Sequence, residues 1–420
     1  MSESETDVDP FGLLPDELVM RVFSFCDHLR TKFRLDRVSQ RFCRCSRDPN
    51  SWARHHTFAL SIESRAGGGG WKLNELKFNS STGAEQNKSA EALSVGVEAF
   101  LSRLHKKWIT SLKFSVLRAP DQSDDDARQL VLSKIWSQHE KFCLKTVEMV
   151  EKFPLQAVDL YNWCLSRFGH SLTKVELHLP ERQHFKSYDT VLRILGDKHC
   201  LVEELTLAGG PSFDAERLAT CFAQMPLKSL CLMMQSDLTG AGMAELWRKM
   251  PSDNRLISHF RVLKSRSFSL KAFINTIIPL GVAPSNDCYS YPQMHLLQVV
   301  NCDTSVDNLE SLVVLFRFFP NLRHVDVGPA LVRTVEDAVT AVNHIGEALQ
   351  ARAECAEAST FRVMLLVESR YRVSHTLEKA IRLLGIGSTI RTCEGVPLKR
   401  RITKGNVLVD LMVVERVLVP

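Results

Sequence analysis

One short hydrophobic pattern recurs along most of the chain. It consists of an apolar residue, two residues of any kind, a second apolar residue, one further residue and a third apolar residue. The pattern occupies nine segments, 73–78, 109–114, 144–149, 172–177, 202–207, 227–232, 257–262, 294–299 and 322–327, and a tenth at 361–366 fits it poorly. Because alternate side chains of a strand share one face, each segment predicts a short strand with one buried face. The return of such a strand roughly every 30 residues is typical of a repeat architecture.

The segments between these strands have the length and the apolar spacing of amphipathic helices. They are 93–108, 158–168, 215–225, 243–250, 309–319 and 335–349. Strands that alternate with helices on this period predict a curved parallel sheet with helices outside it. An ordinary two-layer α/β domain also alternates strands and helices, but the fixed apolar spacing within the nine strands favours a solenoid. The predicted fold class is therefore α/β.

A separate helical pattern occupies the first part of the chain. The helix is predicted to begin at Pro15, whose fixed φ suits the first helical position. Two apolar stripes then run along it, the first formed by Leu14, Leu18, Val22 and Phe25 and the second by Val19 and Phe23. About 40 residues of local chain cannot cover so much apolar surface, so we expect part of it to face a partner or the next domain.

Four sequence blocks in this region lie in the order of a known module. They are Leu-Pro-Asp-Glu-Leu at 14–18, Val-Phe-Ser at 22–24, Arg-Val-Ser-Gln-Arg-Phe at 37–42 and Asp-Pro-Asn-Ser-Trp at 48–52. The segment resembles an F-box, the three-helix module by which substrate receptors dock on the Skp-type adaptor of a cullin-based ubiquitin ligase. Phe42 stands where many members carry Trp, and Cys26 where they often carry Leu. A generic N-terminal helical cap on a larger domain is the alternative interpretation.

The resemblance implies an apolar seam, part of which holds the helices together while the rest binds the adaptor. Its members are Leu14, Pro15, Leu18, Val22, Phe25, Leu35, Val38, Phe42 and Trp52. Position in the family motif suggests that Leu14, Pro15, Leu18 and Val22 point outward. Trp52 is expected to pin the last turn against the start of the repeats.

The recurring strand pattern resembles that of leucine-rich repeats, and an F-box followed by such repeats is a common pairing. Family members place an Asn or Cys just after each strand, where its side chain bonds the turn backbone. Only Cys302 fits that place, whereas Ser81, Pro180, Gly210 and Gln235 do not. The resemblance therefore implies an irregular leucine-rich-repeat solenoid, with a curved parallel sheet inside and helices outside.

The predicted domains are a disordered acidic tail at 1–10, a three-helix F-box at 11–56 and the repeats at 57–420. A closing strand is expected at 407–414, and the most basic run, 398–404, is expected to be a solvated loop before it. The residues that alternate with the core positions should face the concave side of the solenoid and bind a protein target. The candidates are Lys77, Lys113, Lys174, Glu176, Met233, His259, Arg261, Gln298, His324 and Asp326.

Composition and charge argue against several classes of function. A net charge of +5 over 420 residues is mild, so no dedicated nucleic-acid binding is expected. No run approaches 18 apolar residues, and the acidic N-terminus is unlike a signal peptide, so neither a membrane partner nor secretion is expected. The 12 cysteines are scattered without a Cys-x-x-Cys pair, which predicts free thiols and no zinc site.

The sequence carries none of the usual catalytic or nucleotide-binding motifs. We therefore expect a non-catalytic substrate receptor of a Skp-cullin-F-box ubiquitin ligase, cytoplasmic and/or nuclear, without a cofactor or metal. Its partners would be the Skp-type adaptor, through it a cullin scaffold, and an unknown protein target. The alternatives are a scaffold that binds an adaptor outside any ligase, a small-molecule sensor whose repeats enclose a cofactor such as an inositol phosphate, and a repeat protein that inhibits an enzyme.

Overall fold

The computed structural model divides the chain into two compact units, residues 1–147 and 148–420. It describes residues 11–26, 34–35, 37–48, 51, 58–64, 71–76, 90–102, 109–116, 133–151, 164–178, 195–196, 201–209, 215–222, 225–235, 237–249, 257–277, 294–319, 321–353, 359–368, 375–377, 379–381, 389–391, 398–404 and 407–416. Each unit is described by itself below.

The first unit contains a helix pair and a small group of strands. Its helices are α1 (Asp16–Ser24), α3 (Gln40–Arg47) and α4 (Ala90–Ser102), with a 3-10 turn at His139–Lys141. Its strands are β1 (Phe58–Ser64), β2 (Trp71–Leu76), β3 (Ile109–Val116) and β4 (Phe142–Glu151), the last crossing the division between the units. β1 pairs with β3 in parallel and with β2 in antiparallel register. The first segment of the recurring pattern, 73–78, overlaps β2, which pairs antiparallel with β1. The pattern does not predict β1 itself.

The second unit is an open α/β structure. Its strands are β5 (Lys174–His178), β6 (Glu204–Ala208), β7 (Ser229–Met233), β8 (His259–Leu263), β9 (Leu296–Val300), β10 (His324–Val332), β11 (Ser359–Glu368), β12 (Thr389–Arg391), β13 (Leu398–Lys404) and β14 (Val407–Arg416). They lie in the linear order β5-β6-β7-β8-β9-β10-β11-β14-β13-β12. Neighbours from β5 to β11, and then β11 and β14, are parallel.

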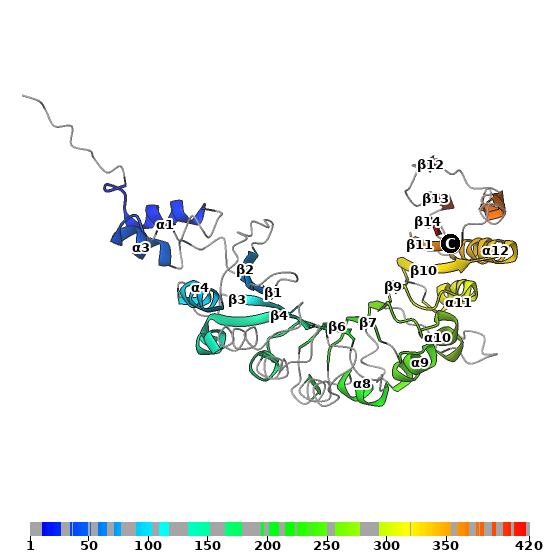
Figure 1. Ribbon diagram of the computed structural model, residues 1–420, viewed down its shortest axis with the longest axis horizontal. Coiled ribbons are helices and arrows are strands. Elements are labelled where there is room, and N and C mark those ends of the chain that lie inside the picture. The colour runs from blue at the N-terminus through cyan, green and yellow to red at the C-terminus, as the bar shows by residue number, and fades with distance from the viewer. Residues whose placement is uncertain are drawn as a thin grey trace, which may run out of the picture. The chain divides into compact units, whose positions relative to one another are not determined.

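The helices of the second unit lie on one side of these strands (Figure 1). They are α8 (Ala215–Phe222), α9 (Gly240–Lys249), α10 (Leu270–Ile277), α11 (Ser311–Phe318) and α12 (Val335–Ala353), with a 3-10 turn at Val306–Leu309. Parallel strands need a crossover connection, and these helices supply it. The predicted α/β fold class, with a parallel sheet and helices along one face of it, is confirmed at this level.

The core of the second unit is built in register from the predicted apolar positions. Leu205, Leu230, Phe260, Leu297 and Val325 are aligned across five neighbouring strands, and each is at most 3% exposed. Full burial of one such side chain stabilises the fold by roughly 1.5–3 kcal/mol. The repetition of this row explains why one apolar spacing recurs along the chain.

The turns that follow β6 to β9 form a second ladder. The backbone passes through a positive φ at Gly209 (68°), Met234 (54°), Lys264 (56°) and Asn301 (56°). The amide of each of these residues donates to a carbonyl of the next strand or turn over 2.7–2.8 Å. Each of these turns is therefore hydrogen-bonded through its backbone to the next repeat.

After three of these bends, the side chain of the next residue forms hydrogen bonds with further backbone groups. The Gln235 amide Nε2 donates to the Gly209 carbonyl over 2.6 Å. The Ser265 hydroxyl accepts the Gln235 amide, and the Cys302 thiol donates to the Val262 carbonyl. Cys302 carries the residue type expected at this place and bonds the backbone, and the longer amide of Gln235 also reaches the turn backbone.

The C-terminal strands are arranged differently from the sequence-based expectation. The basic run 398–404 is strand β13, antiparallel to β14, and not a solvated loop. The strand predicted at 407–414 is present as β14, but it lies between β11 and β13, so β12 forms the edge. Within the described residues, no helix is both long and apolar enough to cross a membrane.

Candidate functional site

A small core holds α1 against α3. Val19 and Phe23 of α1 and Cys45 of α3 are at most 2% exposed. The Phe42 ring packs edge-on against Phe23, with ring centroids 5.1 Å apart, and against Phe11 at 5.4 Å. Phe42 therefore contributes an aromatic ring to the packing between α1, α3 and the chain before α1.

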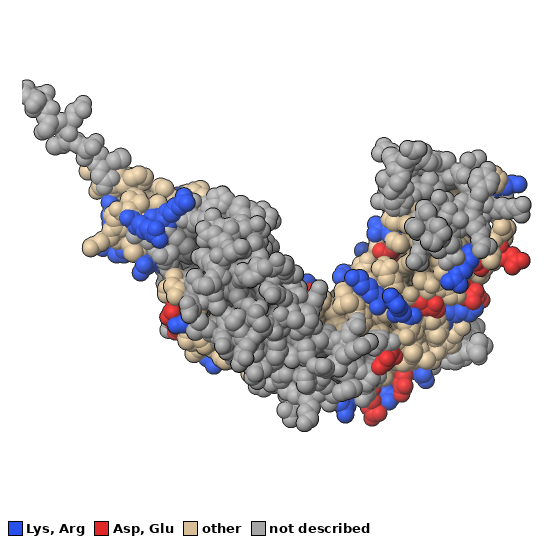
Figure 2. Space-filling view, in the orientation of Figure 1, with Lys and Arg blue, Asp and Glu red and all other residues tan. Residues whose placement is uncertain are grey.

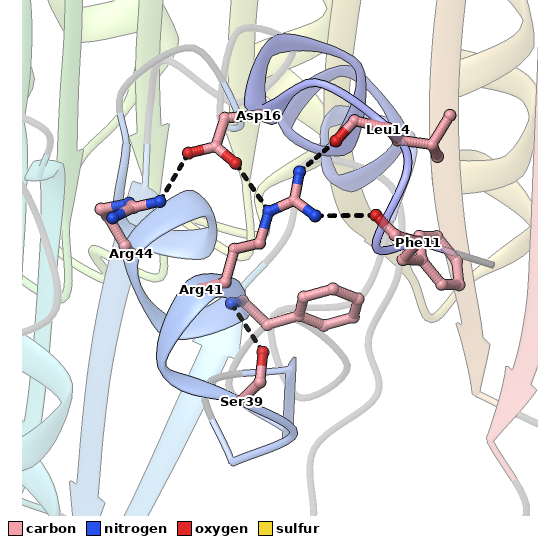
Figure 3. Close-up of polar contacts among 7 residues, drawn as sticks. Phe11, Leu14, Asp16, Ser39, Arg41 and Arg44 are labelled. Atoms are coloured by element: carbon pink, nitrogen blue, oxygen red, sulfur yellow. Dashed lines mark hydrogen bonds and ion pairs between the residues drawn. The ribbon is translucent and has the colours of Figure 1, made fainter. Parts of the chain in front are cut away.

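Arg41 fixes the chain that leads into α1. Its Nε donates to Asp16 Oδ1 over 2.7 Å, and its Nη1 and Nη2 donate to the carbonyls of Phe11 and Leu14, respectively. Figure 3 shows the guanidinium of α3 pointing into the bend formed by these residues, with Arg44 on the other oxygen of Asp16. One side chain thus satisfies backbone groups that lie 27 to 30 residues earlier in the chain.

The same contacts place negative charge at the start of α1. Hydrogen bonds from Arg41 and Arg44 hold the pKa of Asp16 below its ordinary value of 3.8. Asp16 therefore stays ionised at neutral pH, where its charge also suits the positive end of the helix dipole. Ser39 caps the second helix by accepting the Phe42 amide over 3.1 Å.

The other stripe of α1 is not covered by this core. Leu18, Val22 and Phe25 are 45%, 44% and 52% exposed, and Val38 between the helices is 64% exposed. Large apolar side chains that gather on one face of a small helical unit are typical of an interaction surface. We call Leu18, Val22, Phe25 and Val38 the N-terminal apolar face.

The structure divides the predicted adaptor-binding residues into two groups. Leu14, Leu35 and Phe42 are partly buried and pack against the Val19–Phe23–Cys45 core, so they hold the helices together. Pro15 is exposed, as are the four members of the N-terminal apolar face. Leu14 was expected to point outward, but it packs against the core of the helix pair. Trp52 lies outside the described residues.

A second surface is the face of the parallel sheet opposite the helices. Strand registry aligns its side chains into rows that run across the strands. The middle row contains Cys231, Arg261, Gln298, Asp326 and Arg362, from β7 to β11. The row before it contains Ser229, His259, Leu296, His324 and Thr360, and the row after it begins Met233, Leu263 and Val300.

Most of the predicted target-binding residues lie on this face. Lys174 and Glu176 are on β5, Met233 on β7, His259 and Arg261 on β8, Gln298 on β9, and His324 and Asp326 on β10. Lys113 is on β3 of the first unit, and Lys77 lies outside the described residues. Strand registry thus gathers the residues from β7 to β10 into adjacent rows, although they are separated by up to 93 positions in the sequence (233 to 326).

The charges on this face are partly compensated. Arg362 Nη1 lies 3.6 Å from Asp326 Oδ2, and burial raises the pKa of this carboxyl although Arg362 opposes the shift. Burial, together with the Arg261 and His295 charges, lowers the pKa of His259 below 6.5. Sequence reasoning did not select Arg362, because the pattern of its strand, β11, is the least regular of the series.

No group of three or more His, Cys, Asp or Glu side chains in the described part of the chain could hold a metal ion. Burial raises the pKa of the Cys231 and Cys302 thiols, so these buried cysteines are not activated nucleophiles.

No family model matches this chain, and no curated protein matches it in sequence.

Proposed function

We propose that this chain is a non-catalytic substrate receptor of a Skp-cullin-F-box ubiquitin ligase. Residues 11–56 would be an F-box that binds the Skp-type adaptor, and the following chain an irregular leucine-rich-repeat solenoid that binds a protein target. Ubiquitin transfer would then be performed by other subunits, and this chain would contribute proximity by holding the target near them.

The observation that carries the proposal is the separation of the two stripes on α1. Val19 and Phe23 are buried against α3, whereas Leu18, Val22 and Phe25 remain about half exposed. The helix pair is therefore packed without the N-terminal apolar face. Burial of each such side chain in a partner is worth roughly 1.5–3 kcal/mol, which is enough for specific binding when three act together.

The rim of this face indicates the charge of the partner. Arg21 is exposed on α1, as is Glu17, and Arg34 and Arg37 are exposed close to Val38 in the sequence. Basic and uncharged atoms dominate the visible surface of α1 and α3 in Figure 2. An adaptor surface with an apolar centre and an acidic rim would complement this arrangement.

The turn ladder of the second unit supports the leucine-rich-repeat part. Gln235, Ser265 and Cys302 bond turn backbone at equivalent places of successive repeats. In the family that the pattern resembles, Asn or Cys side chains perform this task. Substitution by Gln and Ser accounts for the weak match of the sequence to the family pattern.

The test is a pull-down with purified Skp-type adaptor. The intact chain is compared with a Leu18→Ala/Val22→Ala variant and with a Leu201→Ala/Val339→Ala control. The control removes the same two side-chain types at similar exposure, 53% and 41%, from the second unit. We expect the first variant to lose adaptor binding, with an unchanged circular dichroism spectrum, and the control to retain it.

The proposal would be refuted if the intact chain did not bind the adaptor. It would also be refuted if the Leu18→Ala/Val22→Ala variant and the control bound the adaptor equally. Adaptor binding without recruitment of a cullin would instead favour the alternative, a scaffold that uses its repeats outside a ligase.

A further inference from the structure

The sheet face of the second unit contains a cation with one unused hydrogen-bond donor. Arg261 Nε is buried and has no hydrogen-bond partner within the described part of the chain. The neighbours of Arg261 along its row are Cys231 and Gln298, which carry no charge at neutral pH. Two carboxylates of the same row lie within three strands of Arg261: Asp326 is two strands away and is paired with Arg362, and Glu176 is three strands away and is hydrogen-bonded to His178.

An unsatisfied buried donor has a free-energy cost, and the cost is larger for a charged group than for a neutral one. Arginine adds a geometric preference, because its planar fork matches two oxygens of one carboxylate. A ligand oxygen that reaches Nε would therefore remove an existing penalty as well as form a charge-assisted hydrogen bond.

The surroundings of Arg261 define the rest of the ligand. Leu263 lies two residues further along β8, and Met233 and Val300 flank it on the adjacent strands. All three are partly exposed on the face that carries Arg261. Two residues along a strand span about 7 Å, which is also the spacing of side chains i and i+2 in an extended peptide.

The charge of the site fits one carboxylate better than a phosphate. Asp326 is paired with Arg362, Glu204 with Lys174 and Glu176 with His178, and the pKa of His259 is lowered. Arg261 therefore supplies one positive charge at neutral pH that no ion pair of the described residues neutralises. A phosphate dianion would retain a negative charge near Asp326.

We propose that Arg261 anchors an acidic side chain of a protein target, and that Met233, Leu263 and Val300 receive an apolar side chain two residues away in the same extended segment. This inference rests on the target-binding half of the proposed function and specifies the class of target: a segment with an acidic-x-apolar core.

The experiment measures binding of short synthetic peptides to the full-length chain. The peptides share one sequence with a Glu-x-Leu, a Gln-x-Leu or a phosphoserine-x-Leu core. The proteins are the wild type, Arg261→Gln and Arg266→Gln. The last is the matched control, because it removes the same charge from an exposed arginine five residues later in the chain.

We expect the wild type and Arg266→Gln to bind the Glu peptide about tenfold more tightly than the Gln peptide. Arg261→Gln should lose this preference while its melting temperature is no lower than that of the wild type, because the buried Nε has no partner to lose. A purely structural arginine would instead lower the melting temperature.

Three outcomes would overturn the inference: equal affinity of the wild type for the Glu and Gln peptides, an unchanged preference in Arg261→Gln, or tighter binding of the phosphoserine peptide than of the Glu peptide. Loss of the preference together with a lowered melting temperature would show that Arg261 is structural, and would equally overturn it. None of these measurements involves the adaptor, so a failure here is distinct from a failure of the adaptor pull-down.

Discussion

The contact between α9 and α10 offers a test of how closely the repeats are packed. Gly240 is the first residue of α9, and its φ is not in the left-handed region, so the backbone conformation itself would accept alanine. A Cβ at this position, however, would lie 2.3 Å from the Ser269 carbonyl oxygen, 2.6 Å from the Phe273 amide nitrogen and 2.9 Å from the Ala272 Cβ. Two of these atoms belong to the backbone, so no side-chain rotation relieves the overlap.

The cost of Gly240→Ala follows from this geometry. An ordinary carbon–oxygen contact needs about 1 Å more, and α9 and α10 must separate by a comparable distance. A gap of 0.5–1 Å removes roughly a quarter to a half of each dispersion contact. Met243 and Trp247 of α9, with Phe273 and Ile274 of α10, are at most 1% exposed and would lose these contacts. Overpacking of this kind costs about 1–3 kcal/mol, and the helix propensity of alanine offsets at most about 1 kcal/mol.

The assay is hydrogen exchange of peptides that cover α9 and α10, with Gly196→Ala as the matched control. A Cβ at Gly196 would meet only the Cys221 Cα, at an ordinary 3.6 Å, so this substitution should be neutral or slightly stabilising. We expect Gly240→Ala to increase local opening roughly 5- to 30-fold, which corresponds to about 1–2 kcal/mol net. Protection equal to that of the wild type would refute the inferred close approach of the two helices.

Two further predictions concern polar contacts. Because Arg41 and Arg44 lower the pKa of Asp16, the stabilising contribution of this carboxylate should be complete above the unfolded value of 3.8 and should decline as the pH falls below it. The difference in hydrogen-exchange protection of α1 between the wild type and Asp16→Asn should therefore be full at about pH 5 and shrink in stronger acid. A difference that stays constant with pH would contradict the ion pair. Gln235→Ala should leave the Gly209 carbonyl without its 2.6 Å donor and lower the free energy of unfolding by about 1–3 kcal/mol, measured by urea denaturation, whereas an unchanged midpoint would show that water replaces the amide.

The sequence determined the strands of the second unit from β5 to β11, and the burial of their alternate positions, but not β12 and β13. Strands were predicted at every segment of the recurring pattern from 172 to 366, and each segment overlaps a strand of the structure. This succeeds because alternation and helical spacing are local properties, readable within a few residues. The same local rule identified Arg261, Gln298 and His324 as members of the non-core face before any strand was paired.

Tertiary structure decided which apolar surface is used and which charges are paired. The two stripes of α1 are equally apolar in sequence, and only the approach of α3, more than 20 residues later, buries one of them. Arg41 donates to the carbonyls of Phe11 and Leu14, which lie 30 and 27 positions earlier in the sequence. Arg362 of β11 pairs with Asp326 of the neighbouring strand β10. These contacts depend on the packing of distant segments, which periodicity does not encode. The unused donor of Arg261 likewise became visible only once its neighbours in the row were known.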